Sequence, residues 1–209
     1  MRRSGTAPVP LPASFYARST PWVARRLLGH YLVSDIGGRT HRTVGRIVET
    51  EAYLGPHDPA CHAFGDRRTP RTEGLYGPPG TAYIYFTYGM HWCLNAVTEA
   101  REYPAAVLIR ALEPVAGLAA MRRRRGGGRG GAGVSDRQLC SGPAKLCEAL
   151  GVTGALNGAA LQRGPLRILK NPARGRLEVA VAGRVGIMRA KDWPLRFSVA
   201  DSPWVSAAR

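Results

Sequence analysis

The sequence has few acidic residues, very little lysine and no long apolar run. It contains 14 Asp and Glu against 30 Lys and Arg, which gives a formal net charge of +16, and lysine occurs only at Lys145, Lys170 and Lys191. A membrane-spanning helix needs about 20 consecutive apolar residues, and the chain has no such run. An arginine excess of this size favours a polyanionic partner, so we expect nucleic acid and no membrane.

Cysteine is also scarce and lacks the spacing of a metal site. The four residues are Cys61, Cys93, Cys140 and Cys147, and no two of them form a Cys-x-x-Cys pair. This spacing favours free thiols over zinc ligands, and we expect neither a metal nor another cofactor. The N-terminal residues lack the apolar core of a secretory signal. This predicts an intracellular protein, in the cytoplasm or nucleoid of a bacterium or in a eukaryotic nucleus.

The length of 209 residues, of which 44% are hydrophobic, predicts one domain with a sizeable core. Antiparallel strands mixed with scattered helices indicate an α+β fold. We expect residues 1–18 to be loose, 19–209 to form the domain and the Arg/Gly-rich run 122–134 to be disordered. Helices are predicted at 21–28, at 143–150 and shortly before 122, and strands at 31–35, 43–53, 81–97 (a hairpin), 105–112, 166–169, 177–187 and 195–199.

The segment 45–55 carries two acids in an otherwise apolar strand. Alternate residues of a strand share a face, so Glu49, Glu51 and Tyr53 are expected to point the same way. Acids among β-branched residues fit a plain core strand poorly, and an acid at a strand end, beside a tyrosine and a polar loop, is typical of a general base. A half-exposed strand with a solvated Glu face is the alternative.

Aromatic residues gather in the predicted hairpin at 81–97. Its turn lies near Tyr88, and an aromatic tip on a basic protein could wedge between stacked bases. Tyr53 and Tyr85 could stack on a flat ligand. The alternatives are that Tyr88 packs on its own sheet and that the other two rings belong to the core.

Two segments could bind phosphate. Ser141, Gly142 and Lys145 place free backbone N–H groups and a cation at a predicted helix start, which suits an anion, although plain helix capping would need the same residues. The run 122–134 could contact phosphates without sequence preference, or it could be a solvated linker.

Together these motifs resemble the alkyladenine (3-methyladenine) DNA glycosylases over about residues 20–206. The resemblance implies an enzyme that flips alkylated or deaminated purines, such as 3-methyladenine, 7-methylguanine, hypoxanthine and ethenoadenine, from duplex DNA and hydrolyses the N-glycosidic bond. It further implies a monomer with a curved sheet and a protruding hairpin that enters the DNA. The segments that carry the resemblance are 45–56, 69–71, 79–90, 94–95, 107–114, 139–147 and 194–206.

The resemblance also implies roles for single residues. Glu51 matches the general base, and Arg110 matches an arginine that helps to hold the attacking water. Base loss passes through a sugar cation, which a nearby carboxylate would stabilise. Glu49 shares the predicted face of Glu51, but Tyr53 directly follows Glu51 on that face, so we favour Glu51.

The base pocket follows from the same resemblance. Tyr53 and Tyr85 match two rings that sandwich the flipped base, with His62 on the pocket wall. Asn95 matches a residue that crowds out the exocyclic amine of guanine, and Tyr88 matches the intercalating residue at the hairpin tip.

Other functions remain open at this stage. The chain departs from the family pattern at the Arg/Gly run 122–134 and at His91 and Trp92. Charge alone would equally favour a non-catalytic RNA- or ribosome-binding protein. A glycosidase for free nucleosides would need the acid but neither the net charge nor the aromatic tip.

Overall fold

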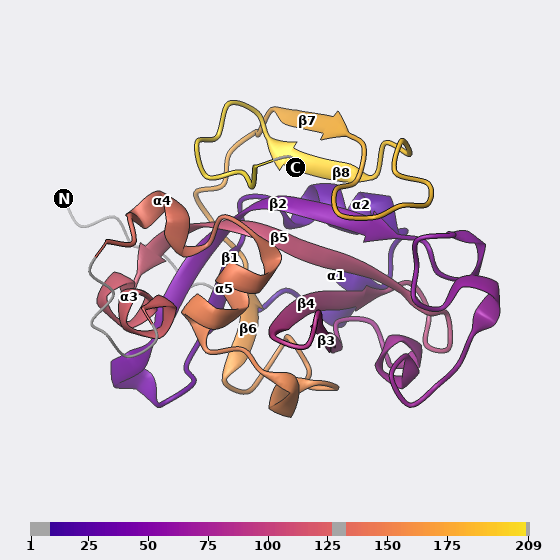
Figure 1. The fold of residues 1–209 in the computed structure, drawn as a ribbon, viewed down its shortest axis with the longest axis horizontal. Coiled ribbons are helices and arrows are strands. Elements are labelled where there is room, and N and C mark those ends of the chain that lie inside the picture. Colours follow the sequence, from indigo (N-terminus) through magenta and orange to yellow (C-terminus); the bar gives the residue numbers. More distant parts are fainter. Residues whose placement is uncertain (1–8, 127–132, 208–209) are drawn as a thin grey trace.

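The fold is built around one long strand, β2 (Thr43–Tyr53), in a computed structural model that describes residues 9–126 and 133–207. On one side β2 pairs with β5 (Ala105–Ala116), and on the other it pairs first with β1 (Tyr31–Ser34) and then with β8 (Arg196–Val199). These pairings are antiparallel. They bring an early strand, β1, and a late strand, β8, to the same central strand (Figure 1).

The sheet has eight strands in the order β3-β4-β5-β2-β1-β6, with β7 and β8 branching from β2. Every named strand pair is antiparallel, and helices accompany the sheet, so the predicted α+β fold is confirmed. The remaining strands are β3 (Ala82–Thr87), β4 (His91–Thr98), β6 (Leu166–Leu169) and β7 (Val179–Ala182).

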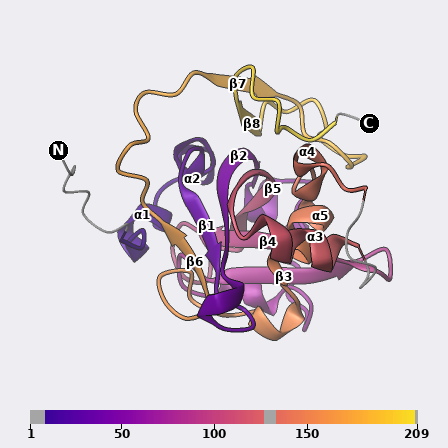
Figure 2. The same ribbon diagram turned by 90° about the vertical axis from the view of Figure 1, so that its left-hand side faces the viewer.

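Helices cover both faces of the sheet, and Figure 2 shows the strands between the two groups. None of the described helices is long and apolar enough to cross a membrane. One group is α1 (Ala13–Tyr16) and α2 (Thr20–Leu27); the other is α3 (Leu118–Arg125), α4 (Asp136–Leu139) and α5 (Pro143–Leu150). Short 3₁₀ turns occur at Arg39–His41, Gly55–His57, Phe64–Asp66, Glu73–Tyr76 and Gly154–Leu156.

The alternation of β2 decides which side chains face which helices. The Thr50 hydroxyl donates to the Ala24 carbonyl of α2 at 2.9 Å. Because neighbouring strand residues point to opposite faces, Glu51 faces away from α2, toward the side that carries α5. The shared face that the sequence predicts for Glu49 and Glu51 agrees with the contacts described below.

The β2–β5 ladder is irregular at its centre. Ile47 pairs with Leu112 and Glu49 with Ala111, so Val48 is passed over; Thr50 then pairs with Ile109, which passes over Arg110. Bulges of this kind re-aim side chains and often lie beside active sites. The Arg110 side chain starts from this interruption.

Of two stretches that the sequence predicts to be loose (1–18) or disordered (122–134), the described parts are ordered in the structure. Within the segment 1–18, Leu11 and the α1 residue Tyr16 are buried in the core, and the Leu11 N–H donates to the Ile168 carbonyl at 2.9 Å. Residues 1–8 lie outside the described residues. Apolar contacts with the sheet edge outweigh the proline-rich composition that suggested a loose segment.

The sequence predicts disorder for the run 122–134, but residues 122–125 are helical in the structure. Strand β5 extends past the predicted end at 112, and α3 then includes the first four arginines of the run. The Arg124 guanidinium donates to the carbonyls of Ala149 and Ile36, both at 3.0 Å, and Arg125 forms an ion pair with Glu148. Residues 127–132 lie outside the described residues.

Candidate active site

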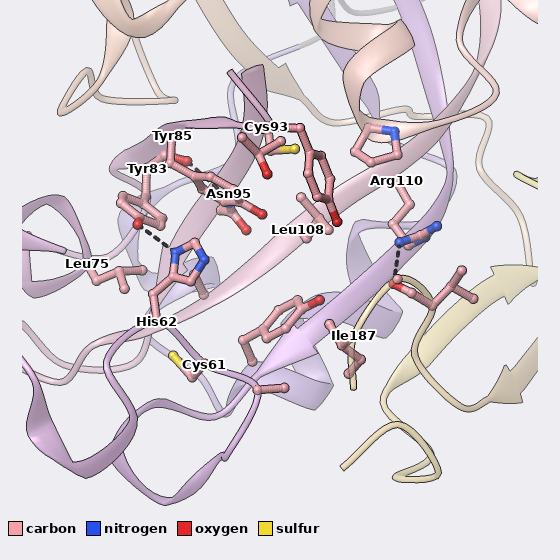
Figure 3. A pocket seen from close by; sticks show the side chains of 18 residues that line it. Cys61, His62, Leu75, Tyr83, Tyr85, Cys93, Asn95, Leu108, Arg110 and Ile187 are labelled. Carbon is pink, nitrogen blue, oxygen red and sulfur yellow. Dashed lines mark hydrogen bonds between the residues drawn. The ribbon is translucent and has the colours of Figure 1, made fainter. Parts of the chain in front are cut away.

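A cavity of about 320 Å³ opens on the face of the sheet that carries α5. Six residues predicted from the sequence lie in its wall. Figure 3 shows several of these side chains converging from β3, β4, β5 and the loop after β2. The predicted residues in the wall are Tyr53, His62, Tyr85, Tyr88, Asn95 and Arg110. The others are Ala60, Cys61, Leu75, Tyr83, Thr87, Cys93, Ala106, Leu108, Pro143, Val185, Gly186 and Ile187.

Glu51 lies behind this wall and is fully buried. Its Oε2 accepts a hydrogen bond from the Tyr53 hydroxyl at 2.9 Å, and its Oε1 accepts one from the Val185 N–H at 2.7 Å. Arg110 Nη1 lies 3.2 Å from Oε1. Tyr53, Val185 and Arg110 all line the cavity, so three direct partners of the carboxylate connect it to the open space.

Arg110 is held between two carboxylates. Its Nε donates to Glu49 Oε1 at 3.2 Å, while Nη1 faces Glu51 and donates to the Val185 carbonyl at 3.3 Å. Glu49 Oε2 accepts the Ser206 N–H at 2.7 Å, and Arg196 lies 3.5 Å from Oε1. Arg110 is shared by both acids, but the other two partners of Glu49, Ser206 and Arg196, do not line the cavity. The other two partners of Glu51, Tyr53 and Val185, do line it.

Burial makes Glu51 a stronger base than an exposed carboxylate. Desolvation raises the pKa of Glu51 above its ordinary 4.5, and the Arg110 charge, the Val185 N–H and the Tyr53 hydroxyl offset this only in part. A raised pKa brings a carboxylate closer to the range in which it can take and return a proton near neutral pH.

The aromatic wall of the cavity is uncharged at neutral pH. Burial, with a smaller contribution from Arg71, lowers the pKa of His62 to about 4. His62 Nδ1 shares a hydrogen bond with the Tyr83 hydroxyl at 2.9 Å (Figure 3), and the His62 ring meets the Tyr85 ring edge-on with centroids 4.5 Å apart. The site residues proposed from the sequence omitted Tyr83, which shares the strand face of Tyr85.

Asn95 and Tyr88 are held in defined places. Asn95 Nδ2 donates to the Tyr83 carbonyl at 3.1 Å, across the paired strands β3 and β4. Tyr88 stands at the hairpin tip, 81% exposed, with φ 51°. A bulky residue in this left-handed region is strained, and such strain gathers at functional sites.

A buried ion pair that the sequence analysis did not identify supports the site. Asp58 and Arg184 are both fully buried, with Nη1 and Nη2 of Arg184 donating at 2.5 and 2.8 Å to the two carboxylate oxygens. The guanidinium also lies 4.8 Å from the centre of the Tyr53 ring. Val185, the next residue, bonds to Glu51 and Arg110, so this pair positions the loop 183–191. Asp58 was visible only as a polar loop residue, and its partner lies 126 residues away.

The predicted phosphate site lies next to the cavity. Lys145 Nζ donates to Ser141 Oγ at 3.3 Å, and Pro143, which begins α5 after Gly142, lines the cavity. Among the described residues, no group of three His, Cys, Asp or Glu side chains could hold a metal ion.

Comparison with known proteins identifies the family. The model of the methylpurine-DNA glycosylase family matches residues 14–203. The chain belongs to this family. It is therefore a hydrolase of N-glycosidic bonds that acts on DNA and takes part in DNA repair.

Individual relatives extend this similarity. The chain is 47% identical to a protein of Carboxydothermus hydrogenoformans that is provisionally named a 3-methyladenine DNA glycosylase, over 94% of the chain and 98% of that protein. It is 43% identical to the DNA-3-methyladenine glycosylases of Homo sapiens and Mus musculus, over 94% of the chain in each case. It spans 67% of the human protein and 61% of the mouse protein.

Removing one partner of the buried ion pair between Asp58 and Arg184 should destabilise this glycosylase. Asp58→Ala should lower the free energy of unfolding by about 3–5 kcal/mol, because it leaves Arg184 charged and buried without its carboxylate. The double variant Asp58→Ala, Arg184→Met should lose less than the sum of the two single variants. Urea unfolding of the four proteins measures this coupling, and strict additivity would show that the two side chains do not stabilise each other.

Glu51→Gln should stabilise the folded protein at pH 8. The folded pKa lies above the unfolded one, so ionised Glu51 costs stability above the folded pKa and nothing below about 4.5. The gain in melting temperature over the wild type should therefore shrink as the pH falls toward 4.5. Glu113→Gln, at the half-exposed pair with Arg46, should show no such gain. A variant less stable than the wild type at pH 8 would contradict this assignment.

Proposed function

We propose that the cavity receives a damaged purine flipped from duplex DNA and that Glu51 activates the water that replaces it. The observation that supports this most is the buried Glu51 carboxylate, joined to an aromatic cavity by Tyr53 and Arg110. The family membership and the names of the relatives agree with this substrate class. The substrates would include 3-methyladenine, 7-methylguanine, hypoxanthine and ethenoadenine.

In the proposed reaction, water is the nucleophile, the damaged base is the leaving group and Glu51 is the general base. The water oxygen bonds to the sugar C1′, the bond from C1′ to the base nitrogen breaks with its electron pair going to the base, and Glu51 takes the proton from the water. Each carboxylate oxygen has two acceptor positions. Oε2 accepts one bond, from Tyr53, in the structure, so it can accept a second from water.

Glu49 supports this chemistry from behind. Arg110 would attract the water, but an unbalanced cation would repel both the sugar cation and a positively charged lesion. Glu49 offsets the charge of Arg110, which leaves the charge of Glu51 available to the reacting sugar. The neutral His62 likewise adds no repulsion to a cationic base.

The pocket walls account for selection of the base. Tyr53 and Tyr85 present electron-rich rings, which attract cationic purines by cation–π interaction. Asn95, fixed to the Tyr83 carbonyl, would exclude guanine by a clash with its exocyclic amine. Tyr88 would fill the gap that the flipped nucleotide leaves, and a monomer suffices because one chain supplies all of these groups.

A non-catalytic RNA- or ribosome-binding protein is the alternative function. It has no use for carboxylates buried away from the basic surface, and burying a charge is expensive unless it is paired. The wall of rings around such a carboxylate favours the glycosylase. An enzyme with this function would work at the chromosome, in a nucleoid or a nucleus.

Glu51→Gln should abolish excision while leaving lesion binding nearly unchanged. Loss of a general base typically costs 10²–10⁴-fold in rate. The measurement is single-turnover release of hypoxanthine from a duplex, followed by alkaline cleavage of the abasic product, with binding measured in parallel. Glu113→Gln, on the neighbouring strand, is the matched control and should keep the wild-type rate. A near wild-type rate for Glu51→Gln would move the role of base to Glu49.

Tyr88→Ala should weaken binding of a lesion in a matched duplex more than binding of the same lesion in a mismatch. Extruding a base from an intact stack costs a few kcal/mol, and a mismatch has already lost part of that stacking. Fluorescence anisotropy with both duplexes gives the two affinities. Val115→Ala, an exposed apolar residue away from the cavity, should change neither. Equal losses in both contexts would exclude a wedge.

A further inference from the structure

A second cavity lies on the other face of the sheet. It has a volume of about 450 Å³, and its wall contains four arginines, which we call the arginine groove. The four arginines are Arg25, Arg26, Arg174 and Arg176. None of them forms an ion pair with a carboxylate among residues 9–126 and 133–207.

The groove is a built feature rather than a set of loose side chains. Asn171 is buried, and its Nδ2 donates to the Gly29 carbonyl at 3.0 Å. Arg174 Nε donates to the Leu28 carbonyl at 2.5 Å. These bonds fix the segment 171–177 against the end of α2. Helix α2, which carries Arg25 and Arg26, and the segment 171–177, which carries Arg174 and Arg176, are therefore held in a fixed position relative to each other.

Stacking orients two of the guanidinium groups. The Arg25 guanidinium lies 5.0 Å from the centre of the Phe197 ring, and that of Arg26 lies 5.6 Å from the Trp22 ring. Arg18 stacks on the same Trp22 ring at 5.0 Å. A guanidinium that stacks by its face keeps its N–H edge for a ligand, and this edge matches phosphate oxygens in a bidentate geometry.

The concentration of positive charge in the groove is unfavourable without an anion. Burial and then the charges of Arg174, Lys170 and Arg26 lower the pKa of the neighbouring His30 to about 4. Desolvation and the charge of Arg26 also lower the pKa of Arg174. A purely structural explanation is that Arg174 caps the C-terminus of α2 through its bond to the Leu28 carbonyl. This explanation does not account for the exposed Arg176.

The groove and the active site face opposite ways. Ala24, directly before Arg25, accepts the hydrogen bond from Thr50, whereas Glu51 points to the face with the aromatic cavity. Figure 2 shows α2 on the side of the sheet opposite to α5. A duplex that places the Tyr88 tip in its groove has the sheet and α2 between it and the arginines.

We propose that the arginine groove is a second DNA-binding site, which binds the phosphate backbone of a segment other than the one that enters the active site. DNA is the polyanion on which this family acts, and the choice of a duplex rests on the function proposed above. Arginine rather than lysine matches a phosphate backbone, and contacts of this kind carry no sequence preference. One chain then holds two duplexes, one on each face.

The test is capture of a second duplex, which does not depend on excision. Enzyme bound to an immobilised lesion duplex is offered a fluorescent undamaged duplex of about 12 base pairs, roughly 40 Å long. The wild type should retain it. The triple variant Arg25→Gln, Arg26→Gln, Arg176→Gln should retain at least tenfold less, and the salt slope of capture should fall by about 0.9 for each lost phosphate contact.

The matched control removes the same charge elsewhere. Arg39→Gln, Arg101→Gln, Arg163→Gln changes three exposed arginines that line neither cavity, and it should capture the second duplex as the wild type does. Single-turnover excision from one short duplex should be equal in all three proteins. Sedimentation should find one chain with two duplexes in the captured complex.

Four results would overturn the proposal. Equal loss of capture in both triple variants would show a general charge effect, and two chains in each complex would show bridging by a protein dimer. Loss of binding to phosphatidylserine vesicles with normal duplex capture would assign the groove to a membrane surface. Weaker binding of the first duplex by the groove variant alone would place the groove on the path of the substrate.

Discussion

The site depends on one guanidinium between two buried carboxylates. Arg110 bonds to Glu49 and lies 3.2 Å from Glu51, and neither acid has any exposed surface. The guanidinium charge lies between the two carboxylates and attracts both. Arg110 starts where the β2–β5 register is interrupted, so the irregular sheet and the chemistry have a common origin.

The aromatic cavity follows from the same strand pairings. β2 brings Tyr53, β3 brings Tyr83 and Tyr85, and β4 brings Asn95 to one face, while the loop after β2 adds His62. Burial keeps His62 neutral and raises the pKa of Glu51, so one cause produces an uncharged wall and a stronger base. The proposed function uses both features, because the uncharged wall would hold a flat cationic base and the carboxylate behind it would face the sugar from which that base departs.

Local sequence patterns were enough to predict the features that depend on neighbouring residues, namely the alternation of a strand, a hairpin turn and the end of a helix. The strand with Glu49 and Glu51, the turn at Tyr88 and the helix ended by Gly151 all follow from neighbours along the chain. The pair of Asp58 with Arg184 could not be predicted, because it joins residues 126 positions apart. The order in α3 was missed because its arginines bond to carbonyls of distant segments, and composition carries no information about such partners.

The position of Ser206 has a consequence for the time at which the enzyme becomes active during synthesis. Its N–H donates to Glu49 and its hydroxyl accepts from Arg110, so the charge cluster on β2 is completed by a residue that is synthesised 157 positions after Glu49. A ribosome releases the chain from its N-terminus onward at about 5–20 residues per second. A nascent or prematurely stopped chain that ends before Ser206 therefore lacks both of these contacts, so we expect the charge cluster to be complete only after this residue has been made.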